Sequence, residues 1–98
     1  SYKALRVLDL SYNELEELPS QIGLLRTLKE LFVSFNNLRK LPPELGKCAN
    51  LDKITAQHNK IRIVPNELSQ LQFLKSLDLT GNRMRVIPPE VAEIPEIQ

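Results

Sequence analysis

The chain has no tryptophan, one cysteine, one histidine and three glycines among its 98 residues. A single cysteine cannot form an internal disulfide, and one cysteine with one histidine cannot supply the four ligands of a tetrahedral metal site. The glycines, Gly23, Gly46 and Gly81, do not form a GxGxxG or GxxxxGK[ST] phosphate-binding loop. The sequence therefore offers no motif for a metal, a cofactor or a nucleotide.

The chain also lacks an excess of either charge and any long apolar run. Its 13 basic and 12 acidic residues give a net charge of +1, so no general attraction to nucleic acid or to a membrane surface is expected. No stretch approaches the roughly 18 apolar residues of a membrane span, and no signal-peptide pattern is present. The lone Cys48 and the absence of any Asn-x-Ser/Thr acceptor favour a reducing, cytoplasmic setting, with the nucleus as an alternative.

What the chain does have is one short unit written four times. Asparagines recur every 23 residues at Asn13, Asn36, Asn59 and Asn82. Each stands in the same aliphatic frame, which in the first copy runs from Leu5 through Leu8 and Leu10 to Leu15. A second signal recurs with the same period at Leu18-Pro19, Leu41-Pro42, Val64-Pro65 and Ile87-Pro88. Repeats of 20 to 50 residues indicate a solenoid.

Each unit predicts one strand and one return crossing. The alternating aliphatics of the frame suit a short extended segment with one face toward a core. Stacked parallel strands require a crossover, and the prolines suit the start of a short helical or 3₁₀ turn there. Gly23 and Gly46 suit a tight bend after that turn.

The LxxLxLxxNxLxxLPxxI frame resembles that of intracellular, Ras-associated leucine-rich repeat proteins. The resemblance covers essentially the whole chain and implies an α/β, right-handed leucine-rich repeat solenoid. Such a solenoid has short parallel strands on its concave face and 3₁₀ or short helical turns on its convex side. Residues 1–98 would be one domain with repeats at 5–27, 28–50, 51–73 and 74–96.

The two ends of the chain suggest a fragment of a longer array. Ile97 occupies the frame position of Leu5, so a fifth copy begins at the carboxyl end. Terminal repeats normally need polar caps, because each unit buries its apolar face only against its neighbours. We therefore expect exposed apolar residues at both ends and self-association through them. At the amino end these are Leu5, Leu8 and Leu10, and at the carboxyl end Val91, Ile94 and Ile97.

The residues at inward positions are expected to stabilise the fold rather than to take part in catalysis. A buried asparagine has donors and acceptors enough to satisfy backbone groups where each strand bends. Cys48 stands at the repeat position of Leu25 and Leu71, which points its side chain into the core, where a thiol is inert. A Cys48–His58 nucleophile pair is therefore disfavoured, and the chain is expected to be non-catalytic.

The outward strand positions differ between copies and are the candidates for binding. They form ladders across the concave face, and Phe32 is the candidate anchor because Asp9, Thr55 and Asp78 hold its position elsewhere. Aromatic anchors dominate the binding energy of many protein interfaces. For Tyr12, Phe35 and His58, packing along the strand edge is the alternative. The predicted partner-binding residues are Arg6, Asp9, Tyr12, Lys29, Glu30, Phe32, Phe35, Lys53, Thr55, Gln57, His58 and Asp78.

A separate stripe consists of Arg39, Arg62 and Arg85, one per repeat, where the first repeat has Glu16. It suits an acidic partner surface, with a merely solvated face as the alternative. Nucleic acid is disfavoured, because a dedicated binder would be strongly basic and would offer outward aromatics for stacking.

The resemblance implies a protein-binding module or scaffold in intracellular signalling, with Ras-type small GTPases or their regulators among the candidate partners. The alternative is the targeting or regulatory array of a larger enzyme, such as an adenylyl cyclase, a phosphatase or a deadenylase. The residues themselves do not single out a GTPase.

Overall fold

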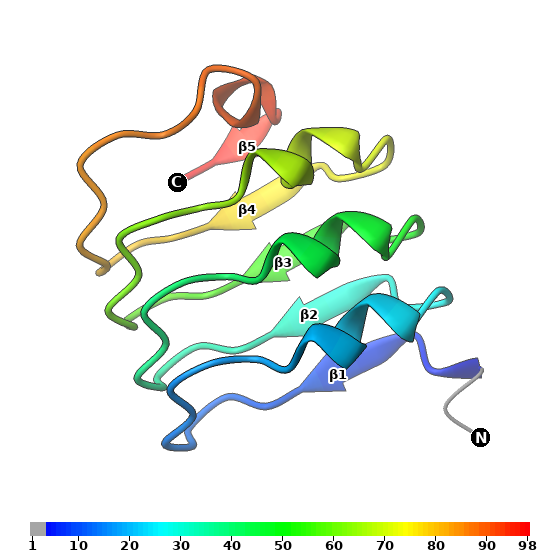
Figure 1. The fold of residues 1–98 in the computed structure, drawn as a ribbon, viewed down its shortest axis with the longest axis horizontal. Helices are drawn as coiled ribbons and strands as arrows, with labels where there is room; N and C mark the ends of the chain where they lie inside the picture. Colours follow the sequence, from blue (N-terminus) through cyan, green and yellow to red (C-terminus); the bar gives the residue numbers. More distant parts are fainter. Residues whose placement is uncertain (1–3) are drawn as a thin grey trace.

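The computed structural model describes residues 4–98, and residues 1–3 of the predicted domain lie outside the described residues. One parallel sheet forms its spine, with the strands in chain order and each hydrogen-bonded to the next. The strands are β1 (Val7–Asp9), β2 (Glu30–Phe32), β3 (Lys53–Thr55), β4 (Ser76–Asp78) and β5 (Glu96–Ile97). Figure 1 shows them side by side from blue to red, so each repeat adds one strand and one return crossing.

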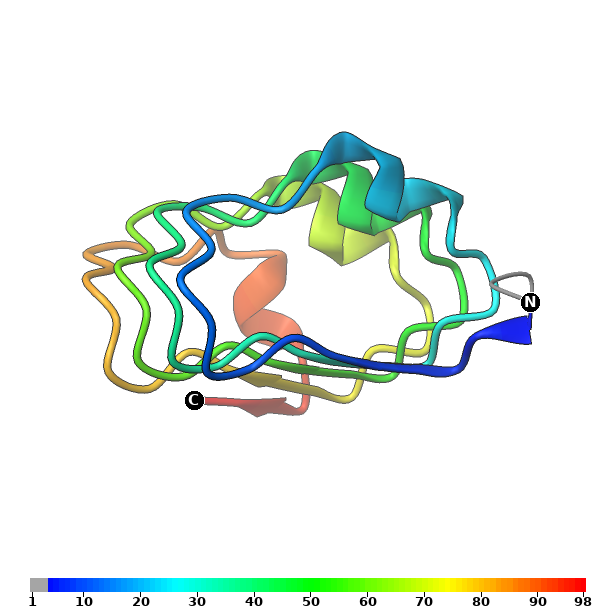
Figure 2. The same cartoon turned by 90° about the horizontal axis from the view of Figure 1, so that it is seen from below.

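The return crossings contain short 3₁₀ helices. These are η2 (Ser20–Leu24), η3 (Pro43–Lys47), η4 (Asn66–Gln70) and η5 (Val91–Glu93). Figure 2 shows the strands in one layer and the helices on the opposite side of the stack. The predicted leucine-rich repeat solenoid, with short parallel strands alternating with 3₁₀ turns, is confirmed.

The prolines of the second signal precede the helices. Pro19, Pro42 and Pro65 are extended and lie directly before η2, η3 and η4. A residue that lacks an N–H fits there, because the first N–H groups of a helix have no partner inside it. In the fourth repeat the helix begins later, at Val91, with Glu90 rather than Pro88 directly before it.

The register of the sheet aligns equivalent residues of successive repeats. Leu8 pairs with Leu31, Leu31 with Ile54, and Ile54 with Leu77. The last three of these side chains are fully buried, while their neighbours along each strand point outward. The period of two within each strand therefore sorts the residues into a core face and a surface face.

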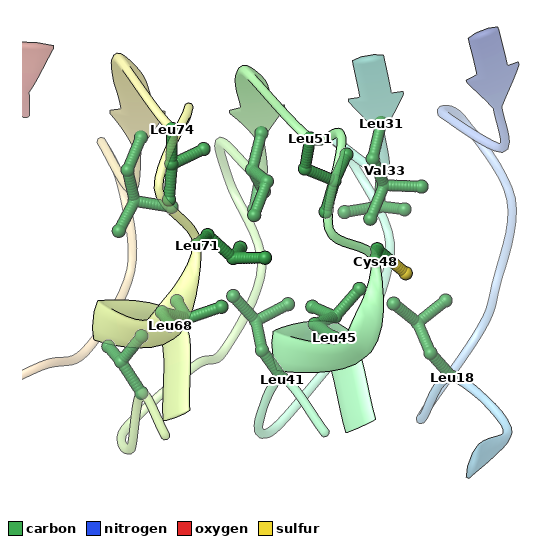
Figure 3. Close-up of a cluster of buried hydrophobic side chains, with 14 of the residues drawn as sticks. Leu18, Leu31, Val33, Leu41, Leu45, Cys48, Leu51, Leu68, Leu71 and Leu74 are labelled. Atoms are coloured by element: carbon green, nitrogen blue, oxygen red, sulfur yellow. The ribbon is translucent and has the colours of Figure 1, made fainter. Parts of the chain in front are cut away.

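The core is a continuous aliphatic column between the two layers. Figure 3 shows leucines from the strand side, such as Leu31 in β2 and Leu51 just before β3, facing leucines from the helix side, such as Leu45 and Leu68. Cys48 lies among them, is fully buried, and donates its thiol to the carbonyl oxygen of Ile22 at 3.2 Å. Burial raises the pKa of the Cys48 thiol, and the charge of Arg26 offsets only part of that rise. The core position predicted for Cys48 is confirmed.

The asparagines connect neighbouring repeats. Asn59 accepts a hydrogen bond from the Leu38 N–H at 3.0 Å and donates to the carbonyl oxygens of Val33 (3.0 Å) and Ala56 (3.3 Å). Asn36 makes the equivalent bonds one repeat earlier, and both side chains are buried. The buried, backbone-satisfying role predicted for these two residues is confirmed.

Two glycines have a role other than the predicted bend. Gly23 and Gly46 lie inside η2 and η3, without the positive φ that a tight bend would require. A Cβ on Gly46 would lie 2.7 Å from the carbonyl oxygen of Glu67, and one on Gly23 would lie 2.9 Å from that of Glu44. These glycines therefore allow neighbouring 3₁₀ helices to approach closely.

The two ends of the stack are not alike. The first repeat's frame leucines are only partly buried, as predicted: Leu5, Leu8 and Leu10. At the other end the prediction is wrong for Val91 and Ile94, which are 0% and 9% exposed. Here η5 lies closer to the strand layer than the other helices do (Figure 2), and β5 pairs with β4, so the last turn closes over the core. Ile97 stays partly buried, but it pairs with Leu77 and so takes the register of Leu8 instead of the predicted frame position of Leu5.

None of the helices within residues 4–98 is long and apolar enough to cross a membrane.

Candidate functional site

The sheet face, formed by the outward side chains of β1 to β5, holds the first set of predicted site residues. The register brings Asp9, Phe32, Thr55 and Asp78 into one ladder. A second ladder joins Val7, Glu30, Lys53, Ser76 and Glu96. All twelve residues predicted to bind a partner are exposed or partly exposed, and none is buried. Whether they bind a partner stays a prediction.

Phe32 lies near the middle of the sheet face between the shorter side chains of Asp9 and Thr55. Its ring is partly exposed, and the Lys53 ammonium nitrogen lies 5.6 Å from the ring centroid. An ammonium group at that distance is attracted to the negative face of the ring. Phe32 and Lys53 therefore form a mixed apolar and cationic spot on a face whose other paired strand residues are polar apart from Val7.

Beside this spot, Asp78 accepts three hydrogen bonds. They come from Gln57 Nε2 at 2.6 Å, Thr80 Oγ1 at 2.7 Å and the Thr80 N–H at 3.1 Å. Partial burial raises the pKa of Asp78, but the hydrogen bonds from Thr80 and Gln57, with the charge of His58, outweigh it. The pKa of Asp78 therefore lies below its ordinary value. The carboxylate is fixed in its charged form and held in one orientation.

Where each strand ends, three side chains stack into a ring column consisting of Tyr12, Phe35 and His58. Their ring centroids are 4.7 Å apart at both steps, with interplanar angles of 6° and 24°. All three residues have positive φ, at 60°, 57° and 54°. That left-handed conformation costs roughly 1–2 kcal/mol per non-glycine residue, and the two ring stacks, at about 1 kcal/mol each, offset part of that cost.

The ring column ends at Gly81, which has the same left-handed backbone with φ of 79°. A Cβ on Gly81 would lie 2.5 Å from Nδ1 of His58, so the imidazole occupies the space of a fourth side chain. These contacts favour the packing alternative for the column. Only Tyr12, which is 77% exposed, presents a largely open ring.

Counting in steps of 23 also predicts an outward ladder of Ser11, Ser34, Gln57 and Thr80, but the structure turns part of it inward. Ser34 is 6% exposed, and its hydroxyl oxygen accepts the Gln57 N–H at 3.0 Å. Ser11 accepts the Ser34 N–H in the same way at 3.2 Å. The two serines therefore satisfy strand backbone instead of facing a partner.

The predicted basic stripe lies along the loop edge that follows the ring column. Arg39, Arg62 and Arg85 are exposed, and Lys60 and Arg83 join Arg39 and Arg62 around one hollow. The loops that carry them are hydrogen-bonded across repeats, from the Arg62 N–H to the Arg39 carbonyl oxygen (3.1 Å) among others. The stripe is therefore held by backbone contacts rather than by a flexible loop.

An adjoining open hollow of about 710 Å³, the edge groove, combines charge with apolar surface. Its lining residues are Arg62, Ile63, Val64, Arg83, Arg85, Val86 and Pro88. Ile63 is 67% exposed and Val86 is 76% exposed. Sequence reasoning missed both, although they stand one repeat apart just before the inward positions of Val64 and Ile87.

Within residues 4–98, no three or more His, Cys, Asp or Glu side chains are grouped so that they could hold a metal ion.

Comparisons with known proteins agree with this architecture. A family model described as leucine rich repeat matches residues 26–84, and a second of the same description matches residues 4–25. A leucine-rich repeat protein of Leptospira interrogans is 33% identical over 96% of this chain, with a TM-score of 0.85. The BIR3–SERK2 complex of Arabidopsis thaliana contains a chain that is 33% identical over 97% of this one, with a TM-score of 0.81.

This chain spans 25% of the length of the Leptospira chain and 55% of that of the Arabidopsis chain. No curated protein matches it significantly.

Proposed function

Because this chain belongs to the leucine-rich repeat family, whose domains generally bind proteins, we propose that it is a non-catalytic module that binds a partner protein on its sheet face. The observation that carries the proposal is the Phe32–Lys53 pair. It places a partly exposed ring and a cation together on a rigid surface whose neighbouring side chains are mostly polar.

The rigidity of the sheet face supports this function. Outward residues sit on strands paired in register, and buried asparagines connect each repeat to the one before. Side chains on such a surface lose little conformational freedom on binding, so more of the contact energy appears as affinity. Asp78, oriented by Gln57 and Thr80, supplies a fixed acceptor on the same face.

Phe32→Ala tests the proposal, with Leu24→Ala as the matched control. Leu24 is also exposed but lies in η2, on the helix side of the stack opposite the strands (Figure 2). Partners captured by the wild-type array should be titrated against both variants. The expected loss for Phe32→Ala is about 2 kcal/mol of binding free energy, or roughly thirtyfold. Equal affinities for the three proteins would remove Phe32 as the anchor.

A finer proposal concerns the partner and the setting. We favour an intracellular, cytoplasmic signalling scaffold, with Ras-type small GTPases or their regulators as the first candidates, from the resemblance of the repeat frame. The Arabidopsis neighbour was solved as a complex of two proteins, which supports a protein partner in general. Titration of purified small GTPases in both nucleotide states would test the candidates directly.

The second candidate function is the targeting or regulatory array of a larger enzyme. Both structural neighbours carry their similar repeats within a longer chain, which is the arrangement this function would require. A parent sequence with an adenylyl cyclase, phosphatase or deadenylase domain would favour it. Self-association through the partly exposed leucines of the first repeat is a further proposal, which light scattering at high protein concentration would test.

A further inference from the structure

The edge groove gives a second surface whose chemistry differs from that of the sheet face. Its lining, together with that of the adjoining hollow, contains five cationic side chains and no carboxylate: Arg39, Lys60, Arg62, Arg83 and Arg85. None of the five forms an ion pair with any residue that the structure describes. The protein as a whole has a net charge of only +1, so this is a local concentration of positive charge.

This concentration extends over the second to fourth repeats and is absent from the first. At the first repeat, the corresponding hollow is lined by Glu16 and Glu17 together with Arg39 and Lys40, so acids and bases are balanced there. Toward the third and fourth repeats the acids disappear. Cations stacked one repeat apart repel one another, and no neighbouring carboxylate of this chain relieves that repulsion.

The lining of the groove also has an apolar part. Ile63 and Val86 are equivalent residues of adjacent repeats, both largely exposed, and Pro88 lies beside them. Exposed aliphatic side chains flanked by cations suit a ligand that has both carboxylates and an apolar side chain. A bare phosphate or a nucleic acid backbone would use the cations and leave the aliphatic surface uncovered.

We propose that the edge groove binds an acidic segment of a partner protein, in which an apolar side chain between carboxylates packs on Ile63 and Val86. The carboxylates pair with Arg62 and Arg85, whose guanidinium groups can form two parallel hydrogen bonds to a carboxylate. Arg39, Lys60 and Arg83 add attraction along the same edge. Cross-repeat backbone hydrogen bonds hold the loops in place before binding, such as the Arg83 N–H to the Ile61 carbonyl oxygen at 3.0 Å.

The test uses the whole chain and a fluorescein-labelled peptide, Gly-Glu-Glu-Asp-Leu-Glu-Asp-Glu-Gly, followed by fluorescence anisotropy. Two control peptides replace the acids by their amides or the leucine by serine. We expect the acidic leucine peptide to bind most tightly, and its affinity to fall as salt screens the charges. Absence of binding at low salt, or equal binding of the amide peptide, would overturn the proposal.

Arg62→Glu/Arg85→Glu should weaken peptide binding at least tenfold, because it reverses two charges in the groove. The matched control is Arg26→Glu/Lys47→Glu, which makes the same change in net charge at exposed residues away from the groove. It should stay within twofold of wild type. A milder Arg62→Gln/Arg85→Gln pair covers the case in which charge reversal disturbs folding. Equal losses in the groove and control variants would mean that net charge alone attracts the peptide.

The proposed packing of an apolar side chain on Ile63 and Val86 is tested separately. Ile63→Ser should weaken the leucine peptide several-fold and leave the serine peptide unchanged, since only the former has a side chain to pack there. A single-stranded oligonucleotide of equal charge serves as the competing ligand. Tighter oligonucleotide binding that Arg62→Glu/Arg85→Glu abolishes would assign the groove to phosphates and overturn the proposal.

Phe32→Ala should leave the affinity for the acidic peptide unchanged, because Phe32 is on the sheet face. The experiment can therefore contradict peptide binding in the edge groove without contradicting partner binding on the sheet face, and the reverse.

Discussion

Repeat 1 (5–27) and repeat 3 (51–73) share one frame but differ in their surroundings. Asn59 in repeat 3 makes four side-chain hydrogen bonds, two of them to repeat 2, and is 6% exposed. Asn13 in repeat 1 makes two, both to its own repeat, and is exposed. The same residue at the same repeat position therefore contributes unequally, because half of its partners belong to the preceding copy.

The surfaces of the two repeats differ as well. Repeat 1 has Glu14 and Glu16 on the loop edge where repeat 3 has Lys60 and Arg62. These side chains are exposed in both repeats, so the frame tolerates either sign. The comparison separates positions that the stack requires from positions that are free to recognise a partner.

The largest difference between the repeats should appear in their core residues. Ile54→Ala removes a fully buried side chain and should lower the free energy of unfolding by about 2–5 kcal/mol. Leu8→Ala, at the equivalent but partly exposed position, should cost about 1 kcal/mol. Urea unfolding followed by circular dichroism measures both. Equal losses would mean that repeat 1 is as well packed as repeat 3.

Asn59 and Asn13 allow repeats 3 and 1 to be compared through a polar side chain. Asn59→Leu leaves the Leu38 N–H without its side-chain acceptor and removes one of the two side-chain donors to the Val33 carbonyl oxygen, so it should cost about 1–3 kcal/mol. Asn13→Leu affects only exposed carbonyls and should change stability by less than about 0.5 kcal/mol. Thermal melts of the two variants give the order. An Asn59 variant as stable as the wild type would contradict the role of the asparagine as a link between repeats.

Glu16→Arg would give repeat 1 the charge of the other repeats and extend the basic stripe. If the edge groove binds acidic peptides, affinity for the labelled peptide should rise about threefold, as expected for one added surface charge near the site. Glu67→Arg, which makes the same change in charge on exposed η4, is the control and should have little effect. A similar rise in both variants would assign the effect to net charge.

The smallest predicted effect concerns Asp78, to which repeat 3 donates through Gln57. Gln57→Ser gives repeat 3 the residue of repeat 1 and removes that donor, so the pKa of Asp78 should rise part of the way toward its ordinary value. Thr80 keeps its two hydrogen bonds, which limits the rise. A carbon-detected NMR titration of the carboxyl group measures the change.

The sign of the stability effect follows from the lowered pKa. Asp78 stabilises the fold above the ordinary carboxyl pKa, and this contribution is lost as the pH falls through its lower folded value. Urea unfolding should therefore show a smaller loss of stability between neutral and acidic pH for Asp78→Asn than for the wild type. An identical pH dependence would leave the hydrogen bonds to Asp78 without energetic consequence.

Much of the fold and part of the candidate site could be predicted because the repeat supplies its own register. Cys48 was placed in the core, and Phe32 in a ladder with Asp9 and Thr55, by counting in steps of 23 residues. Counting was misleading at Ser34. The repeat pattern places this residue outward, but its hydroxyl oxygen accepts a hydrogen bond from the Gln57 N–H and is buried. A pattern of apolar and polar residues does not reveal which backbone groups lack a partner.

The sequence pattern also does not show where neighbouring repeats approach each other closely. The packing of Gly46 against Glu67, and the space that Gly81 leaves for the His58 ring, depend on distances between neighbouring repeats. The edge groove also depends on such distances, since Ile63 and Val86 form one apolar surface only when their loops lie side by side.

The sequence by itself determined the period, the parallel stack, the identity of the core and the ladders of outward residues, because each follows from the alternation of apolar side chains within a repeated unit. Only the tertiary structure decided how tightly neighbouring repeats approach, which buried polar groups link them, how η5 closes the last repeat, and where exposed arginines and aliphatics meet in a groove. Those features arise between repeats, where the spacing is set by packing and hydrogen bonding rather than by any single copy.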